Sequence, residues 1–129
     1  MVELALAILT ISDRSFRGEM VDLSGPALAQ FALERHWKVV DTSLVDDDIS
    51  NIESAVRELL KRPDVNLILT TGGTGIGPRD NTPDVLDKLF DKKLPGIGEM
   101  MRLEGLKSTS TSILSRSCAG VIGSKLIIS

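Results

Sequence analysis

The amino-acid sequence predicts an α/β fold built on a mostly parallel sheet with helices on both faces. Short, nearly continuous apolar runs recur along the chain, as in strands that are buried on both faces. Amphipathic segments with helical spacing separate these runs. Such β-α-β-α-β-α alternation is typical of a parallel sheet, because each parallel strand is reached through a crossover helix.

The first strand is expected at residues 4–11, which read Leu-Ala-Leu-Ala-Ile-Leu-Thr-Ile. An eight-residue run followed at once by polar turn formers suits a buried strand, with a short helix as the alternative. Ser24, Gly25 and Pro26 then open a helix, with Ser24 as the candidate N-cap and the proline near the first turn. Residues 37–45 are rich in valine and threonine and predict the second strand.

The next helix begins at residues 50–53, where Ser-Asn-Ile-Glu forms a capping box. The helix ends at residues 62–64 because the residue before a proline is pushed out of α-helical geometry. Residues 65–71 predict a third buried strand. The apolar stripe of the helix consists of Ile52, Ala55, Val56, Leu59 and Leu60.

A glycine-rich loop at residues 72–81 follows the third strand. Residues 82–84 (Thr-Pro-Asp) restart a helix with a cap, a first-turn proline and an acidic first turn. Residues 94–96 (Leu-Pro-Gly) are expected to end this helix, and the segment with Met100, Met101 and Leu103 predicts a further helix with a weaker apolar pattern. Two short strands, at residues 121–122 and 126–128, then flank a tight Gly-Ser turn.

The composition limits the class of protein. A chain of 129 residues has the size of one domain, and 42% apolar with 26% charged residues is typical of a soluble globular protein. A net charge of −3 argues against nucleic-acid or membrane binding through bulk charge. One cysteine and one histidine exclude an intrachain disulfide and a Cys/His zinc cage. Because no apolar run approaches the ~20 residues of a membrane span and the N-terminus lacks the basic opening of a signal peptide, we expect a cytoplasmic protein.

Polar loops follow the three predicted strands, and the carboxyl ends of parallel strands meet at one edge of a sheet, where ligands bind. The first loop contains Ser12 and Asp13, the second is the acidic run 46–48, and the third contains Asp80. Clustered carboxylates repel one another unless a cation lies between them, and oxygen ligands suit Mg²⁺. The structural alternatives are a solvated turn for residues 46–48 and a helix cap for Asp80.

The loop Gly72-Gly73-Thr74-Gly75 allows backbone N–H groups to approach an anion, and the helix start at Thr82 adds partial positive charge. The loop matches neither the Walker A motif nor the dinucleotide fingerprint, and a tight strand-to-helix turn is the alternative interpretation. Together with the flanking Arg14 and Arg79, it points to phosphoryl or nucleotidyl transfer, in which negative charge must be neutralised.

Several motifs follow one another in the order typical of a known family. The matching segments are residues 11–15, 18–19, 22–26, 70–75, 79–84, 94–99 and 112–116. Residues 70–75 (Thr-Thr-Gly-Gly-Thr-Gly) followed by 79–84 (Arg-Asp-Asn-Thr-Pro-Asp) form a far more specific signal than a glycine loop alone. From residue 4 to the last residue, the chain resembles the molybdopterin-binding MogA/MoaB family, whose relatives include the G domain of gephyrin.

The resemblance implies a three-layer α/β/α sandwich with one antiparallel strand, assembled as a homotrimer. The implied activity is molybdopterin adenylyltransfer, in which AMP passes from ATP to molybdopterin with Mg²⁺ and pyrophosphate is released. Asp47 and Asp80 match the family's essential acidic positions, as catalytic residues and Mg²⁺ ligands. The implied cofactor-binding residues are Ser12, Asp13, Thr71, Gly72, Gly73, Thr74, Gly75 and Thr82.

The resemblance leaves several points open. The family continues past the position of Ser129 with a Leu-Pro-Gly-x-Pro segment and a helix, so residues 1–129 are expected to form a single domain without that segment. One alternative function is a non-catalytic, MoaB-like or gephyrin-like module that binds molybdopterin or serves as an oligomeric scaffold. Another is a related domain that acts on other nucleotides or phosphorylated cofactors. The residues themselves do not decide which of Asp46, Asp47 and Asp48 faces the site.

Overall fold

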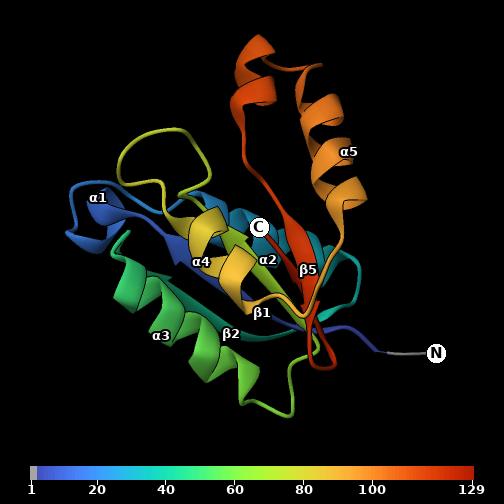
Figure 1. Ribbon diagram of the computed structural model, residues 1–129. Helices are drawn as coiled ribbons and strands as arrows, with labels where there is room; N and C mark the ends of the chain where they lie inside the picture. The colour runs from blue at the N-terminus through green and yellow to red at the C-terminus, as the bar shows by residue number, and fades with distance from the viewer. Residues whose placement is uncertain (1–2) are drawn as a thin grey trace.

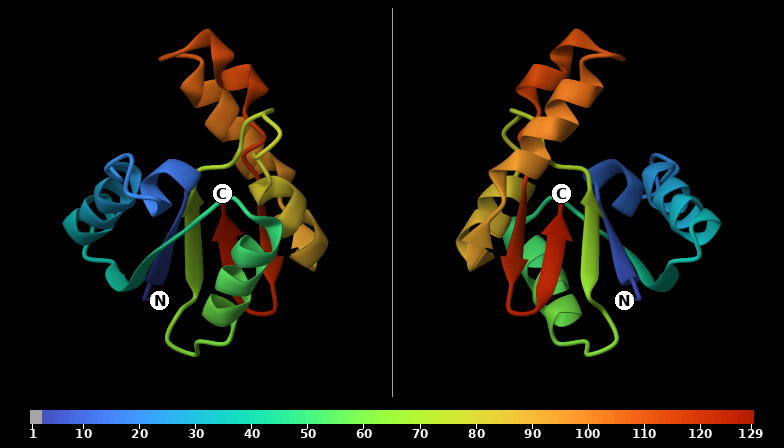
Figure 2. Two further views of the ribbon diagram at one scale, coloured as in Figure 1. Left: turned by 90° about the vertical axis from the view of Figure 1, so that its left-hand side faces the viewer. Right: turned by 90° about the vertical axis from the view of Figure 1, so that its right-hand side faces the viewer.

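The computed structural model describes residues 3–129, which form a six-stranded sheet with helices on both faces (Figures 1 and 2). The strands are β1 (Ala5–Ile11), β2 (Lys38–Val45), β3 (Leu67–Thr71), β4 (Lys92–Lys93), β5 (Ala119–Ile122) and β6 (Lys125–Ile128). Their order in the sheet is β2-β1-β3-β6-β5-β4, and only β5 runs antiparallel to the other strands, against both β4 and β6. The predicted mostly parallel sheet with one antiparallel strand is therefore confirmed.

The helices divide between the two faces of the sheet. They are α1 (Asp13–Phe16), α2 (Ser24–Glu34), α3 (Ile49–Leu60), α4 (Thr82–Leu89), α5 (Pro95–Gly105) and the 3₁₀ helix η1 (Ser110–Leu114). α2 covers one face, and α3 and α4 cover the other (Figure 2). α5 and η1 form an arm that extends beyond the edge to which the arrows of β1 and β3 point (Figures 1 and 2). None of the helices within residues 3–129 combines the length and the apolar character needed to cross a membrane.

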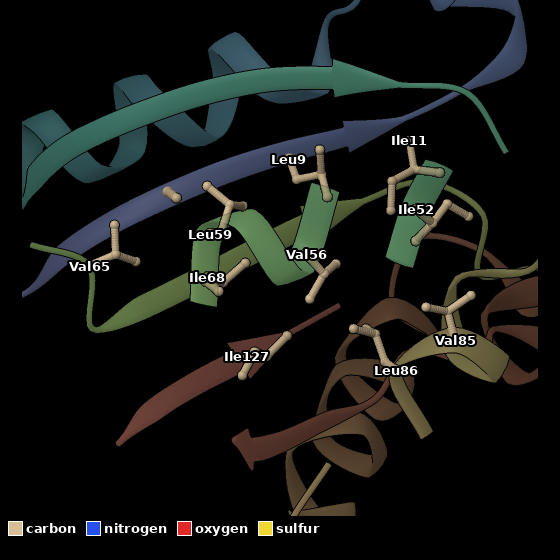
Figure 3. Close-up of a cluster of buried hydrophobic side chains, with 11 residues drawn as sticks. Leu9, Ile11, Ile52, Val56, Leu59, Val65, Ile68, Val85, Leu86 and Ile127 are labelled. Atoms are coloured by element: carbon tan, nitrogen blue, oxygen red, sulfur yellow. The ribbon is translucent and has the colours of Figure 1, made fainter. Parts of the chain in front are cut away.

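The core consists of two apolar layers because successive strand residues point to opposite faces. Leu9 and Ile11 of β1 face α3 and α4 and belong to the larger cluster, which Figure 3 shows. Leu6 and Ile8 of the same strand face α2 and pack near Ala32 in the smaller cluster. Each large apolar side chain that is fully buried here contributes about 1.5–3 kcal/mol, so the sheet is anchored from both sides.

The start of α3 differs from its prediction. The N-cap is Asp48, whose side chain accepts a hydrogen bond from the Asn51 backbone N–H at 3.2 Å. The predicted capping box at Ser50 is therefore wrong by two residues. An aspartate caps as well as a serine does, and the earlier acceptor starts the helix at Ile49.

The start of α2 also differs by one residue. Its N-cap is Leu23, which provides no side-chain hydrogen bond, and Ser24 is the first helical residue. Asp22 instead accepts a hydrogen bond from the Gly25 backbone N–H at 3.1 Å. An acceptor upstream of the expected cap thus satisfies one of the free N–H groups that every helix start carries.

Candidate active site

The loops after β1 and β2 are joined by reciprocal hydrogen bonds. The Asp13 backbone N–H donates to Asp47 Oδ2 at 2.8 Å, and the Asp47 backbone N–H donates to Asp13 Oδ1 at 3.0 Å. Next to them, the Ser12 backbone N–H donates to the carbonyl oxygen of Val45 at 2.9 Å. These bonds bring two acidic side chains together that are 34 residues apart in the sequence.

The loop after β3 reaches the same two residues. The Arg79 guanidinium donates to both carboxylate oxygens of Asp13, at 2.9 and 3.1 Å. The Asn81 side-chain amide donates to the carbonyl oxygen of Asp47 at 2.9 Å. The expectation that all three loops meet at one edge of the sheet is therefore confirmed, because each is hydrogen-bonded to another.

The two linked carboxyl groups differ in their electrostatic environment. The Arg79 guanidinium and, after it, the Asp47 backbone lower the pKa of Asp13 from 3.8 to about 2. Burial raises the pKa of Asp47, and the charges of Asp13 and Asp80 raise it further against the hydrogen bond from the Asp13 backbone. Of these two carboxylates, Asp47, which is 9% exposed, is therefore the one whose charge is less compensated.

The first two glycines of the loop adopt backbone conformations that other residues rarely take. Gly72 has a φ of +101° and Gly73 a φ of +69°. A Cβ at Gly72 would collide with the carbonyl oxygen of Ile11, and a Cβ at Gly73 would collide with Thr82 Oγ1. The backbone therefore lies close against β1 and the start of α4 only because side chains are absent.

The later glycines of the loop make room for Asp80. A Cβ at Gly75 would stand 2.6 Å from Asp80 Oδ2, and a Cβ at Gly77 would stand 2.9 Å from the same oxygen. This oxygen accepts a hydrogen bond from the Gly77 backbone N–H at 2.8 Å. A Cβ at Gly73 would stand 3.0 Å from Asp47 Oδ1, so both acidic side chains lie against the glycine loop.

The glycine loop also presents free backbone donors. Within residues 3–129, the backbone N–H groups of Gly73, Thr74 and Gly75 donate no hydrogen bond. Unpaired N–H groups in a turn bind anions well, and phosphate oxygens are suitable acceptors. The loop therefore places donors for an anion beside carboxylates that favour a cation.

Two adjoining clefts collect most of the predicted site residues. The first has a volume of about 580 Å³ and the second about 520 Å³, both within the usual range for small-molecule sites. The first is lined by Ser12, Asp13, Asp47, Thr71, Gly72, Gly73 and Asp80, and Arg14 also lies in its wall. Thr71 and Gly72 border the second cleft as well, together with Thr74.

Two predicted ligand-binding residues line neither of these clefts. Thr82 is fully buried, and its hydroxyl donates to the carbonyl oxygen of Gly72 at 3.0 Å. It is the first residue of α4, whose N-cap is Asn81, so its expected role as the cap is wrong. The Asp80 carboxylate lies against Gly75, and the carbonyl oxygen of Gly75 accepts a hydrogen bond from Arg116.

The three consecutive aspartates have different environments. Asp47 lies in the wall of the first cleft. Asp46 accepts hydrogen bonds from the Asp48 backbone at 3.1 Å and from the Asn51 side chain at 2.9 Å. Asp48 caps α3. The sequence left this choice open, because neighbouring loop residues can exchange places without changing any pattern.

Several residues around these clefts carry no recognisable functional pattern in the sequence. Asp22 lines the first cleft and accepts a hydrogen bond from the Thr10 hydroxyl at 2.8 Å. Phe31 and Met101 provide apolar surface in the second cleft. Arg116 holds the glycine loop from outside both clefts. Asp22 and Arg116 belong to segments that resemble the known family, so the sequence marked these positions but did not indicate what their side chains do.

Potential cation ligands are limited to a few carboxylates. Asp47 and Asp80 lie in one cleft, and the charge of Asp80 acts on Asp47. Residues 3–129 contain no group of three or more His, Cys, Asp or Glu side chains placed to hold a metal ion. Mg²⁺ usually takes one or two protein carboxylates plus water and substrate phosphates, which fits this pair.

Comparisons with known proteins agree with the motifs. Residues 7–128 match the family model described as a probable molybdopterin binding domain. Over 125 residues the chain is 38% identical to a Helicobacter pylori protein named molybdopterin adenylyltransferase, and the match covers 95% of this chain and 71% of that protein. Over 123 residues it is 40% identical to molybdenum cofactor biosynthesis protein B of Escherichia coli, with the same shares covered. The solved structure of the molybdopterin biosynthesis enzyme MoaB from Thermus thermophilus superposes with a TM-score of 0.89 at 41% identity, covering 97% of this chain and 79% of that one.

Proposed function

Because the chain belongs to the molybdopterin-binding domain family, we propose that it is a Mg²⁺-dependent molybdopterin adenylyltransferase that acts in molybdenum cofactor biosynthesis. In this reaction a terminal phosphate oxygen of molybdopterin attacks the α-phosphorus of ATP. A new P–O bond forms, the bond to the bridging oxygen breaks, and pyrophosphate leaves with its electron pair. The convergence of Asp47, Asp80 and the glycine loop at one cleft is the observation that carries this proposal.

The residues of the first cleft have complementary roles in this proposal. Asp47 and Asp80 hold Mg²⁺, which offsets the negative charge of the phosphates when it is bound. The free N–H group of Gly73, in the wall of the first cleft, and that of Thr74, in the wall of the adjoining second cleft, bind phosphate oxygens. Ser12 and Asp13 complete the wall, and Arg79 keeps Asp13 ionised. Catalysis then depends on positioning and charge neutralisation, as expected for transfer between phosphates.

A second candidate function follows from the relatives. The chain is as similar to a protein named molybdenum cofactor biosynthesis protein B as to one named molybdopterin adenylyltransferase, at 40% and 38% identity. Identity alone therefore does not separate an enzyme from a MoaB-like module that binds molybdopterin, or serves as a scaffold, without efficient transfer.

We also propose that the protein acts as a homotrimer of single molybdopterin-binding domains in the cytoplasm. The arm of α5 and η1 carries exposed apolar side chains, and apolar surface of this kind favours association. They are Met100, Met101, Leu103, Leu106, Ile113 and Leu114. Sedimentation at micromolar concentration tests the assembly, and a mass three times that of the chain is expected.

Pyrophosphate release from ATP and Mg²⁺, measured with and without molybdopterin, tests the proposed activity. We expect release only when molybdopterin is present, and loss of release when EDTA removes Mg²⁺. Molybdopterin binding without pyrophosphate release would favour the MoaB-like module. Competition with GTP and CTP tests the choice of nucleotide, and a preference for either over ATP would replace ATP in the proposal.

A further inference from the structure

Arg116 connects the arm to the glycine loop. It lies between η1 and β5, and it reaches loop residues that are 36 to 42 positions earlier in the chain. Its backbone N–H donates to the carbonyl oxygen of Thr74 at 2.7 Å, and its Nε donates to the carbonyl oxygen of Gly75 at 2.9 Å. Its Nη2 donates to the carbonyl oxygen of Asp80. Its Nη1 contacts both carboxylate oxygens of Asp84 at 3.1 Å.

The two carbonyl groups held by the guanidinium lie at the two ends of the turn that carries Asp80. Inside this turn the Asp80 backbone N–H donates to the carbonyl oxygen of Gly77 at 3.1 Å, and the Gly77 N–H donates to the Asp80 carboxylate at 2.8 Å. The Asp80 side chain also lies directly over Gly75. If the ends of the turn moved apart, the carboxylate would move with them. A planar guanidinium fixes this spacing because its donors point in set directions.

Arg116 is itself held in place by α5. Arg102 Nη1 donates to the carbonyl oxygens of Ser115 and Ser117, at 3.2 and 2.8 Å, on either side of Arg116. Gly98 packs so closely against this segment that a Cβ there would collide with the carbonyl oxygen of Ser117. Residues 115–117 are therefore fixed against α5, and this places the Arg116 backbone so that its side chain can reach the loop.

We propose that Arg116 is a positioning residue that sets the place of the Asp80 carboxylate in the first cleft. It acts through the loop, because its side chain lines neither the first cleft nor the second. The kinetic part of this inference rests on the proposed adenylyl transfer, whereas its structural part concerns the loop alone. Displacement of a residue that holds reacting groups costs about 10- to 100-fold in rate.

Hydrogen exchange of residues 74–81 tests the structural part without relying on activity. We expect Arg116→Ala to speed exchange of the Gly77 and Asp80 amides by about tenfold or more, because the turn opens more often. Arg62→Ala is the matched control, since both arginine side chains are 37% exposed and paired with carboxylates. It should leave exchange in this loop unchanged. Unchanged exchange in Arg116→Ala would overturn the inference.

Two further variants separate the hydrogen bonds to the loop from the ion pair and from folding. Asp84→Asn removes only the ion pair, so exchange and turnover should stay near those of the wild type. Arg116→Lys keeps the charge but lacks the planar fork, so the loop should exchange faster than in the wild type. Arg116→Lys can also replace Arg116→Ala in the exchange experiment if the alanine variant does not fold. Full protection in Arg116→Lys would show that charge alone suffices and would contradict the proposed role.

The kinetic measurement distinguishes failure of this inference from failure of the proposed function. We expect Arg116→Ala to lower kcat for pyrophosphate release by about 10- to 100-fold with little change in the KM for ATP. A wild-type protein that releases no pyrophosphate would remove the proposed function and leave the exchange result to decide the role of Arg116. An active wild type with an unchanged kcat in Arg116→Ala would overturn the positioning role.

Discussion

Asp47 and Asp80 reach the first cleft from different loops and are held there in different ways. Asp47 is nearly buried and is tied to the backbone of Asp13, whereas Asp80 rests on the glycine loop and accepts one backbone hydrogen bond. An asparagine at either position keeps the shape and one acceptor oxygen but removes the charge. Substitution by asparagine therefore tests charge separately from structure.

Asp80→Asn is expected to lower kcat for pyrophosphate release by at least about 100-fold, because one of the two charges that we propose to hold Mg²⁺ is lost. The free energy of unfolding should change by less than about 1 kcal/mol, since asparagine can still accept the hydrogen bond from the Gly77 N–H. Steady-state assays and urea unfolding check the two expectations. Asp64→Asn, at an exposed ion pair far from the cleft, is the control. Unchanged turnover in Asp80→Asn would contradict the assigned role.

The raised pKa of Asp47 predicts an acid limb in the pH profile of kcat/KM. The proposed Mg²⁺ site requires the ionised Asp47 carboxylate, so activity should rise as the pH increases through a pKa above the ordinary aspartate value of about 3.9. Asp13→Asn removes a neighbouring negative charge and releases Arg79 to interact with Asp47. The acid limb should then move to lower pH. A limb that stays in place or moves to higher pH would contradict this electrostatic account.

The carboxyl groups of Asp13 and Asp47 make the free energy of unfolding depend on pH in opposite directions. The pKa of Asp13 falls from 3.8 to about 2 on folding, so its contribution is present above pH 3.8 and is lost as the pH falls toward 2. The pKa of Asp47 rises on folding, so its contribution is present at low pH and is lost as the pH rises through the raised value. The exposed guanidinium of Arg79 keeps the Asp13 contribution small, at about 1 kcal/mol or less.

At the scale of elements, the glycine loop depends on the positive φ angle of Gly72 and on the close approach of Gly72 to β1, and the two can be tested separately. Gly123, in the turn between β5 and β6, also has a positive φ angle, but unlike Gly72 it packs against no other backbone segment. Gly123→Ala should cost about 1–2 kcal/mol, from conformational strain alone. Gly72→Ala should cost about 2–5 kcal/mol, because a collision with the carbonyl oxygen of Ile11 is added. Urea unfolding of the two variants measures the difference, and equal losses would contradict the close approach.

The start of α3 provides a second test at this scale. Asp48→Ala removes the side-chain acceptor at the N-cap and should lower the free energy of unfolding by about 1 kcal/mol. Ser50→Ala should change it by less than about 0.5 kcal/mol, since Ser50 is exposed and lies inside the helix. Thermal or urea unfolding distinguishes the variants. A larger loss in Ser50→Ala would restore the capping box that the sequence suggested.

At the scale of the whole molecule, the sequence predicted the sheet and its helices but not how the site is held. Apolar periodicity is local, so strands such as residues 4–11 and the stripe of α3 could be recognised directly. α1, β4 and η1 have only two to five residues and, unlike the short strands β3, β5 and β6, contain no apolar run that a local pattern could reveal. The mutual hydrogen bonds of Asp13 and Asp47 depend on contacts between distant segments, which no local pattern encodes.

The connection between the arm and the site also spans the whole molecule, and it leads to a prediction about α5. Arg102→Ala should lower the free energy of unfolding by about 1–3 kcal/mol, because two carbonyl oxygens lose a charged donor. It should also lower kcat, but by less than Arg116→Ala does, since the Arg116 side chain remains.

A double-mutant cycle with both arginines decides whether they act in series. If Arg102 acts on the loop only through the segment that carries Arg116, then it has no effect on kcat once Arg116 is an alanine. The double variant should therefore be no slower than Arg116→Ala, although its stability is lower. Losses in kcat that multiply would mean that the two residues act independently. In that case the arm would influence the cleft by a route other than the glycine loop.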